Sequence, residues 1–228
     1  MLTWHRLEAP TRPRFPRRSN RCEAGSRSAS ELPLVPQREA ASPVSLETFS
    51  YCPRCARPLA DRAIKDIEGL VSPRRACTQE CGYVQWGNPV PAVGAIVEHE
   101  GEIILARSAA WPEGFFALVT GYLEAREDPR RAVVREVKEE LGLDVFETNL
   151  VGNYIFERKN EVMLCYHVVA RGTVTLGNEL AEYRRCKPAE LKPWKRATGL
   201  AVADWMRSRG LAFEWDERPA LRAENERT

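Results

Sequence analysis

A short helix that carries three glutamates on one face constrains this chain more than any other feature of its sequence. Asp128 can cap the helix, Pro129 suits its first turn, and Gly142 can end it. Between them an aliphatic residue recurs at every fourth position, at 133, 137 and 141. That period predicts one buried stripe, so the segment is expected to form an amphipathic helix packed against a core.

The polar residues of the same segment indicate its chemistry. Glu136, Glu139 and Glu140 stand at i, i+3 and i+4, so their carboxylates share one face of the helix. Taken alone, such a cluster is most typical of a solvated acidic face. A hard divalent cation would offset the repulsion, since Mg²⁺ prefers carboxylate oxygens and brings phosphate oxygens with it. Arg135 lies four residues before Glu139 and can hold a carboxylate in a fixed rotamer.

The helix belongs to a longer string of specified residues. From Gly121 to Leu143 the spacing is Gly-x5-Glu-x7-Arg-Glu-aliphatic-x-Glu-Glu-x-Gly-aliphatic. At every fixed position this string resembles the signature of the Nudix hydrolase family. The resemblance implies an α/β fold, an α/β/α sandwich around a mixed sheet, over roughly residues 89–208. Thr120 and Arg126 stand where many members have further glycines, and Arg126 can alter which phosphate binds beside it.

The resemblance also implies roles for individual residues. Glu136, Glu139 and Glu140 would bind Mg²⁺ or Mn²⁺, Arg135 would orient them, and Glu127 would support the loop or the second metal shell. Metal ions in such a site neutralise the diphosphate, lower the pKa of bound water and position it for in-line attack on phosphorus.

Three further residues are candidates near this centre. Gly121 would let backbone and carboxylates approach the same ion, and Tyr122 can stack on an adenine, although strand aromatics are more often core residues. Glu179 precedes a weak strand, much as a metal-binding glutamate does in NADH pyrophosphatases. It is our candidate for the catalytic base, with a surface glutamate as the competing interpretation.

A second set of possible metal ligands lies upstream. Cys52 and Cys55 are followed, after 21 residues, by Cys77 and Cys81. Two short cysteine loops at about this spacing supply four thiolates to a tetrahedral Zn²⁺, with disulfides or unpaired thiols as the alternative. The second loop has three intervening residues where two are usual, so it must be wider. The remaining cysteines are interpreted as one tail residue and two small hydrophobic residues: Cys22, Cys165 and Cys186.

A four-cysteine zinc ribbon directly before a Nudix domain resembles the NADH pyrophosphatase branch and related proteins that act on ADP-ribose or FAD. That branch carries a Ser-Gln-Pro-Trp-Pro-Phe-Pro array downstream of the signature. Here the corresponding stretch, Gly152–Glu161, lacks the array. The ribbon therefore implies a structural role, and the substrate within the class stays open.

The chain is expected to divide into four parts. Residues 1–48 form an extension rich in Arg, Pro and Ser that we interpret as disordered, with a transit peptide or an RNA-binding arm as alternatives. Residues 49–88 form the ribbon, 89–208 the Nudix domain and 209–228 a C-terminal tail. Strands are predicted at 92–98 and 102–106 around a Glu-Gly turn, and at 115–119, 148–156, 162–170 and 180–186; a closing helix is predicted at 198–207.

Charge and hydropathy exclude some function classes. Residues 1–50 contain eight of the 34 basic residues and five of the 32 acidic ones, so the rest of the chain is nearly neutral. Nothing in that balance demands nucleic acid or an anionic membrane. No apolar run approaches the roughly 18–20 residues that span a bilayer, and no secretory signal is evident. We expect a soluble, cytoplasmic protein.

These observations together predict a diphosphatase that depends on Mg²⁺ or Mn²⁺. Its partner would be a small-molecule dinucleotide or nucleotide sugar, cleaved to release a nucleoside monophosphate. Removal of NAD-type caps from RNA 5′ ends is the alternative within the enzyme class, with the Arg-rich extension as an arm. A non-catalytic nucleotide sensor is the alternative from another class. A homodimer stays open.

Overall fold

The computed structural model describes residues 49–79 and 81–217 of the 228-residue chain. The predicted N-terminal extension with Cys22, and the last part of the predicted C-terminal tail, lie outside the described residues. In the described part, no helix has both the length and the apolar character needed to cross a membrane.

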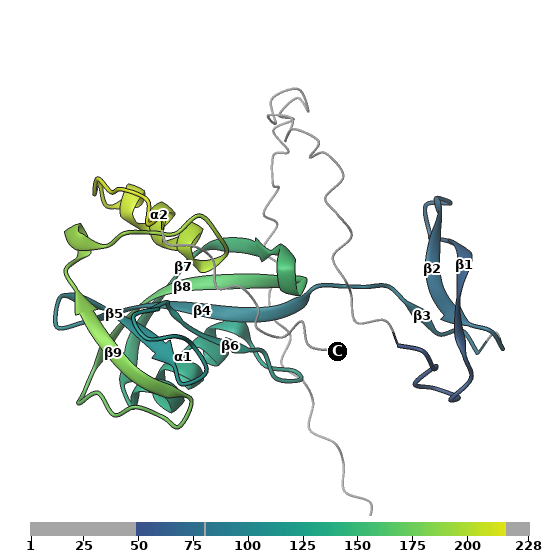
Figure 1. Cartoon of the computed structure of the whole chain (residues 1–228), viewed down its shortest axis with the longest axis horizontal. Coiled ribbons are helices and arrows are strands. Elements are labelled where there is room, and N and C mark those ends of the chain that lie inside the picture. The colour runs from purple at the N-terminus through teal and green to yellow at the C-terminus, as the bar shows by residue number, and fades with distance from the viewer. Residues whose placement is uncertain (1–48, 80, 218–228) are drawn as a thin grey trace, which may run out of the picture. The chain divides into compact units, whose positions relative to one another are not determined.

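The cysteine-containing segment forms a three-stranded antiparallel sheet in the order β1-β2-β3 (Figure 1). Its strands are β1 (Leu59–Lys65), β2 (Val71–Cys77) and β3 (Val84–Gln85). Asp66 shapes the turn between β1 and β2, because its Oδ1 accepts hydrogen bonds from the backbone N–H groups of Glu68 and Leu70 at 3.0 and 2.8 Å. Few residues of this cysteine-containing segment are buried, namely Cys52, Leu59, Ala76 and Cys77.

A mixed six-stranded sheet forms the larger part of the described chain. Its strands are β4 (Val90–His99), β5 (Glu102–Ser108), β6 (Val119–Tyr122), β7 (Asp144–Phe156), β8 (Glu161–Arg171) and β9 (Leu180–Cys186). The order is β7-β8-β4-β5-β9. β5 pairs with residues 97–99 of β4, and β6 pairs with residues 92–95 of the same strand. Only the β4–β8 pair is parallel among the described strands. Glu100 and Gly101, both with positive φ, make the tight turn between β4 and β5 as predicted.

Two α-helices and two short 3₁₀ turns accompany this sheet in the described residues: α1 (Pro129–Leu141), η1 (Glu157–Lys159), η2 (Pro188–Glu190) and α2 (Thr198–Ser208). At the start of α1, the Asp128 side chain accepts hydrogen bonds from the backbone N–H groups of Arg130 and Arg131. At its end, Gly142 adopts φ 72° and donates to the Lys138 carbonyl at 3.0 Å. These local signals set the bounds that the sequence predicted.

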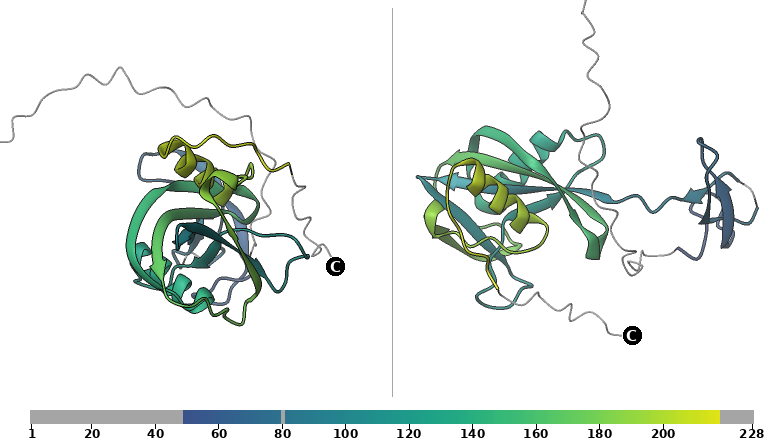
Figure 2. Two further views of the ribbon diagram at one scale, coloured as in Figure 1. Left: turned by 90° about the vertical axis from the view of Figure 1, so that its left-hand side faces the viewer. Right: turned by 90° about the horizontal axis from the view of Figure 1, so that it is seen from above.

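The two helices cover opposite faces of the sheet. Val93, Ala95 and Val97 of β4 are buried with the apolar stripe of α1, whereas Ile96 is buried with Val202 and its neighbours on α2. Successive residues of a strand point to opposite faces, so the two cores lie on the two sides of the sheet. Figures 1 and 2 show this arrangement, with α2 on one side and α1 on the other. The predicted α/β/α sandwich is confirmed.

One strand prediction was wrong. The segment 115–119 is not a strand; β6 begins only at Val119 and runs on to Tyr122. Ala117 makes an isolated bridge with Ala106 of β5, and the chain then crosses to pair with β4. The apolar run at 115–119 indicates burial, but only residues 119–122 pair with a continuous partner strand.

Candidate active site and cysteine cluster

Arg135 of α1 connects the acidic residues of the specified string. Its Nε and Nη2 donate to the two carboxylate oxygens of Glu127 at 2.8 and 2.9 Å. Its Nη1 donates to Glu136 Oε1 at 2.7 Å and to Glu139 Oε2 at 2.9 Å. Nη2 also reaches the Tyr122 carbonyl oxygen at 3.1 Å. The guanidinium group therefore ties the helix, the preceding loop and β6 together.

Glu127 holds this arginine in place. Hydrogen bonds from Arg135, together with one from the Glu124 backbone N–H at 2.9 Å, lower the pKa of Glu127 to about 2. A carboxylate that receives both side-chain and backbone donors is strongly oriented. Glu127 therefore contacts the cluster through Arg135, and its loop-supporting role stays a prediction.

Gly121 of β6 makes room for Glu136. A Cβ atom at residue 121 would overlap the Glu136 carboxyl group, so any other residue would displace it. The glycine is required for this close approach rather than for a turn, because it lies within a strand that pairs with β4.

The acidic side chains repel one another. Burial, opposed in part by Arg135, raises the pKa of Glu136, and Glu139 and Glu179 act in the same direction as burial. Burial also raises the pKa of Glu140 to about 8, with Glu136, Glu179 and Glu139 adding to the effect. Ionisation of these carboxyl groups is unfavourable in the folded chain, and a bound divalent cation would stabilise their charged forms.

Glu179 joins the cluster through the packing of residues 174–179 on the end of α1. Thr175 N–H donates to the Leu141 carbonyl at 2.8 Å, and Gly177 N–H donates to the Glu140 carbonyl at 2.9 Å. A Cβ atom at Gly177 would overlap the Glu139 carbonyl oxygen, so this approach also needs glycine. The tertiary structure thus brings the base candidate beside the helical glutamates.

These groups surround an open cavity of about 440 Å³. The candidate residues that line it are Gly121, Tyr122, Arg135, Glu136, Glu139 and Glu179. Glu140 does not line it, although it interacts electrostatically with Glu136 and Glu179. The structure therefore collects most of the predicted site residues in one place. Glu127 does not line the cavity and is hydrogen-bonded to Arg135, which does.

A second cavity of about 360 Å³ adjoins the first. Its aromatic lining consists of Trp111, Phe115, Phe156 and Trp194. Both cavities share the wall residues Thr120, Lys159, Glu161 and Met163. From the sequence we assigned no site role to Trp111, Phe115 or Trp194. The signal that could have indicated this aromatic cavity was tryptophan outside the regular elements, as at Trp111 and Trp194.

Tyr122 is held in a way that the sequence did not indicate. Its hydroxyl donates to Glu161 at 2.6 Å, and this hydrogen bond raises the pKa of Tyr122 to about 12. The residue is 54% exposed, so its ring borders solvent as well as the cavity. Stacking of this ring on an adenine stays a prediction.

Within the described residues, the cysteines are the one group of three or more possible ligands whose donor atoms all lie within 4.8 Å of one another: Cys52, Cys55, Cys77 and Cys81. The carboxylate oxygens of α1 are not grouped this closely, and Arg135 holds one oxygen each of Glu136 and Glu139.

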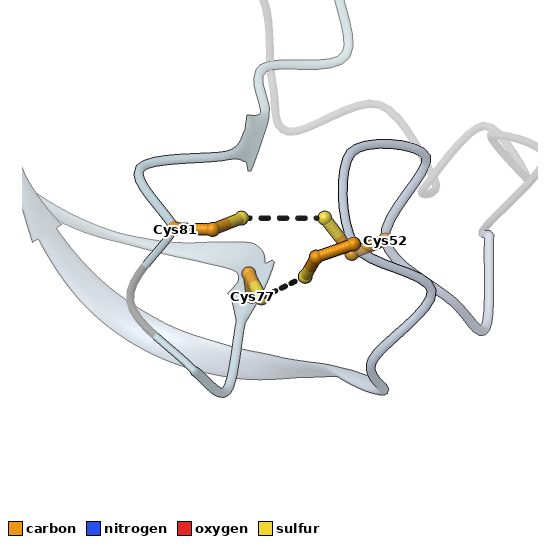
Figure 3. A group of neighbouring side chains, drawn as sticks. Cys52, Cys77 and Cys81 are labelled. Carbon is orange, nitrogen blue, oxygen red and sulfur yellow. Dashed lines mark hydrogen bonds between the residues drawn. The ribbon is translucent and has the colours of Figure 1, made fainter.

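The geometry of the cysteines fits zinc. Cys52 Sγ lies 3.5 Å from Cys81 Sγ (Figure 3). Cys55 Sγ lies 3.4 Å from Cys77 Sγ. Tetrahedral Zn–S bonds of about 2.3 Å separate the sulfurs by about 3.8 Å. A disulfide requires about 2.05 Å, and these four cysteines are free. The donor set therefore matches a Zn²⁺ ion and does not match a pair of disulfides.

Comparison with known proteins gives a consistent result. The family profile described as NUDIX domain matches residues 88–205. A protein from Pseudomonas aeruginosa named NAD-capped RNA hydrolase NudC is 32% identical over 88 residues, which cover 39% of this chain and 32% of that protein. Its namesake from Mycobacterium tuberculosis is 36% identical over 90 residues, covering 39% and 28%. The match thus spans about a third or less of these relatives.

A solved structure shares the fold. The crystal structure of a NUDIX hydrolase from Nitrosomonas europaea superposes with a TM-score of 0.58 at 24% identity. The match covers 73% of this chain and 96% of that one.

Proposed function

Because this chain belongs to the Nudix family, we propose that it hydrolyses the diphosphate bond of an adenosine-containing dinucleotide or nucleotide sugar. The observation that carries the proposal is the close packing at Gly121, which seats the Glu136 carboxyl group beside Arg135 at the edge of the cavity. A site assembled so tightly around several glutamates suits a divalent cation and the phosphate oxygens that accompany it.

In the proposed mechanism, Glu136, Glu139 and Glu140 would hold Mg²⁺ or Mn²⁺. When bound, the cation would neutralise charge on the diphosphate and lower the pKa of the attacking water. Arg135 keeps Glu136 and Glu139 in position through its hydrogen bonds, and Glu127 keeps Arg135 in position. Glu179 accepts the proton of the water that attacks phosphorus.

The neighbouring cavity supports an aromatic leaving fragment. Indole and phenyl rings from Trp111, Phe115 and Trp194 offer apolar surface to a planar ring, and basic side chains at Lys159 and Lys195 border the same space. ADP-ribose, FAD and NAD(H) all combine a diphosphate with such a ring. The sequence lacks the Ser-Gln-Pro-Trp array, so we propose that NADH is no better a substrate than ADP-ribose or FAD.

NAD-cap removal from RNA is the second candidate. The names of the relatives from P. aeruginosa and M. tuberculosis favour it. Removing residues 1–48, which lie outside the described residues, separates the two candidates. Activity on small dinucleotides is expected to survive the deletion. A loss confined to capped RNA, together with steep salt dependence, would favour the RNA substrate.

We also propose that the four cysteines bind one Zn²⁺ and that this zinc stabilises the segment 49–88, as in other structural sites. The division into 1–48, 49–88, 89–208 and 209–228 is kept as part of this proposal. A four-thiolate site suits a reducing compartment, so a cytoplasmic location remains our expectation.

The test is a panel assay in ¹⁸O-labelled water. The full chain, with Mg²⁺ or Mn²⁺, is incubated with NADH, NAD, ADP-ribose, FAD, diadenosine polyphosphates and NAD-capped RNA. A nucleoside monophosphate is expected among the products, with the label on a phosphate. Label on ribose or release of free nicotinamide would refute attack at phosphorus. Absence of turnover across the panel would refute the enzyme assignment.

A further inference from the structure

A buried glutamate stands in the wall between the two cavities. Glu161, the first residue of β8, is only 5% exposed and lines both spaces. Its Oε1 accepts a hydrogen bond from the Tyr122 hydroxyl at 2.6 Å and lies 3.7 Å from Lys159 Nζ. Its Oε2 forms no hydrogen bond with residues 49–79 or 81–217. Because Oε2 is not fully buried, it stays open at the cavity wall, where a ligand can bring a hydrogen-bond donor to it.

Tyr122 links this glutamate to the acidic cluster. The backbone oxygen of Tyr122 accepts a hydrogen bond from Arg135 at 3.1 Å, and its hydroxyl donates to Glu161. The strands β6 and β8 both pair with β4, so Tyr122 and Glu161 are anchored to the same central strand. The position of the Glu161 carboxyl group is therefore coupled to the position of the cluster.

We infer that Glu161 accepts a hydrogen bond from a sugar hydroxyl of the bound nucleotide and makes the site selective for ribose over sugars without that hydroxyl. This inference rests on the proposed function. With the phosphate at the acidic cluster and the ring in the aromatic cavity, the sugar of a nucleotide must pass the wall that the cavities share. Of the charged and hydroxyl-bearing side chains in that wall, Glu161 is the least exposed.

The chemistry of the wall favours a hydroxyl over the other parts of a nucleotide. A carboxylate accepts hydrogen bonds without donating them, and it repels phosphate oxygens. Met163 offers only apolar surface on the same wall. A ligand without the hydroxyl brings no donor to Oε2, and sites that hydrogen-bond a substrate hydroxyl discriminate against the analogue that lacks it.

The experiment is a calorimetric titration of the full chain, in the presence of Mg²⁺, with two probes. One is 5′-AMP and the other is 2′,3′-dideoxy-5′-AMP, which differs only in the missing hydroxyls. The wild-type protein is expected to bind AMP at least about tenfold more tightly, as a hydrogen bond to a charged group predicts. Glu161→Ala should bring the ratio of the two affinities close to one. Glu161→Gln keeps a neutral acceptor of the same size, so its ratio should fall between the two.

Tyr122→Phe is the matched control, because it removes the partner hydroxyl and keeps the carboxylate. The ratio of affinities should stay near the wild-type value, whatever happens to affinity itself. If Tyr122→Phe abolishes discrimination as completely as Glu161→Ala, Glu161 serves only to hold Tyr122 and the inference is wrong. If Glu161→Ala does not fold, an unchanged ratio in Glu161→Gln, which keeps the fold but lacks the charge, overturns it.

The outcomes separate the two proposals. Equal affinity of the wild-type protein for both probes would overturn the role of Glu161 and leave the diphosphatase intact, provided that the panel assay shows turnover. Failure of AMP to bind in the presence of Mg²⁺ would instead count against the proposed function, since the product monophosphate must occupy this site.

Discussion

A Cβ atom at Gly121 would occupy the space that the Glu136 carboxyl group fills. The two residues belong to β6 and α1, and Arg135 donates a hydrogen bond to the same carboxyl group at 2.7 Å. The absence of a side chain at residue 121 of β6 leaves room for the Glu136 carboxyl group, and the hydrogen bond from Arg135 of α1 holds it there. Its position tolerates little adjustment, and this makes the site testable by small changes.

Gly121→Ala should lower turnover by about a hundredfold, because a displacement of about 1 Å at a reacting centre has that effect. Circular dichroism and thermal melting should show that the fold is kept. Gly152→Ala in β7 is the matched control, since its Cβ would crowd the Tyr154 ring, with the Tyr154 hydroxyl oxygen 2.9 Å away. That variant should lose stability without a comparable loss of turnover. Equal activity losses in both variants would contradict the special role of Gly121.

Glu139→Gln and Glu140→Gln should each reduce turnover at least about a hundredfold while keeping the side-chain volume. Without added metal, Glu140→Gln should melt at the wild-type temperature or higher, because burial and neighbouring carboxylates disfavour the charge at Glu140. Mg²⁺ should raise the melting temperature of the wild-type protein more than that of either variant. Glu147→Gln, on the exposed part of β7, should match the wild-type protein in both assays. Near-full turnover in either helical variant at saturating Mg²⁺ would show that the ligands are misassigned.

The Glu127–Arg135 pair should make stability depend on acid pH. The pKa of Glu127 is lowered from 4.5 to about 2 in the folded chain, so the folded state holds the charged form more strongly than the unfolded state. Its contribution is complete above about pH 4.5 and declines as the pH falls toward about 2. Melting temperatures of the wild-type protein and Glu127→Gln should therefore differ at neutral pH and converge at the acid end. A difference that stays constant over this interval would mean that the charge of Glu127 contributes nothing.

Metal analysis of protein purified without chelator should find about one zinc ion per chain. Cys52→Ser should lower the zinc content and the melting temperature together, because zinc binding and folding are coupled in structural sites. Cys186→Ser, in β9 of the other sheet, serves as the control and should keep full zinc content. Zinc-free wild-type protein would refute the site.

Local signals in the sequence were sufficient for several elements. The bounds of α1 follow from Asp128 and Gly142, which satisfy the end groups of the helix within a few residues. The tight turn at Glu100 and Gly101 and the paired cysteine loops likewise depend on near neighbours. The segment 115–119 failed because an apolar run indicates burial, whereas a strand also needs a partner with unpaired backbone groups.

The sequence alone determined which residue types stand at fixed spacing: the glutamates of the helix, the arginine before them and the four cysteines. Only the tertiary structure decided that Glu179 meets the helical glutamates, and that Tyr122 meets Glu161 across the central strand. Those contacts join segments that are 39 or more residues apart, and they depend on strand register and on the glycine at 177. Spacing within a helix follows from the backbone period alone, whereas contacts between strands and loops form only when the whole core packs.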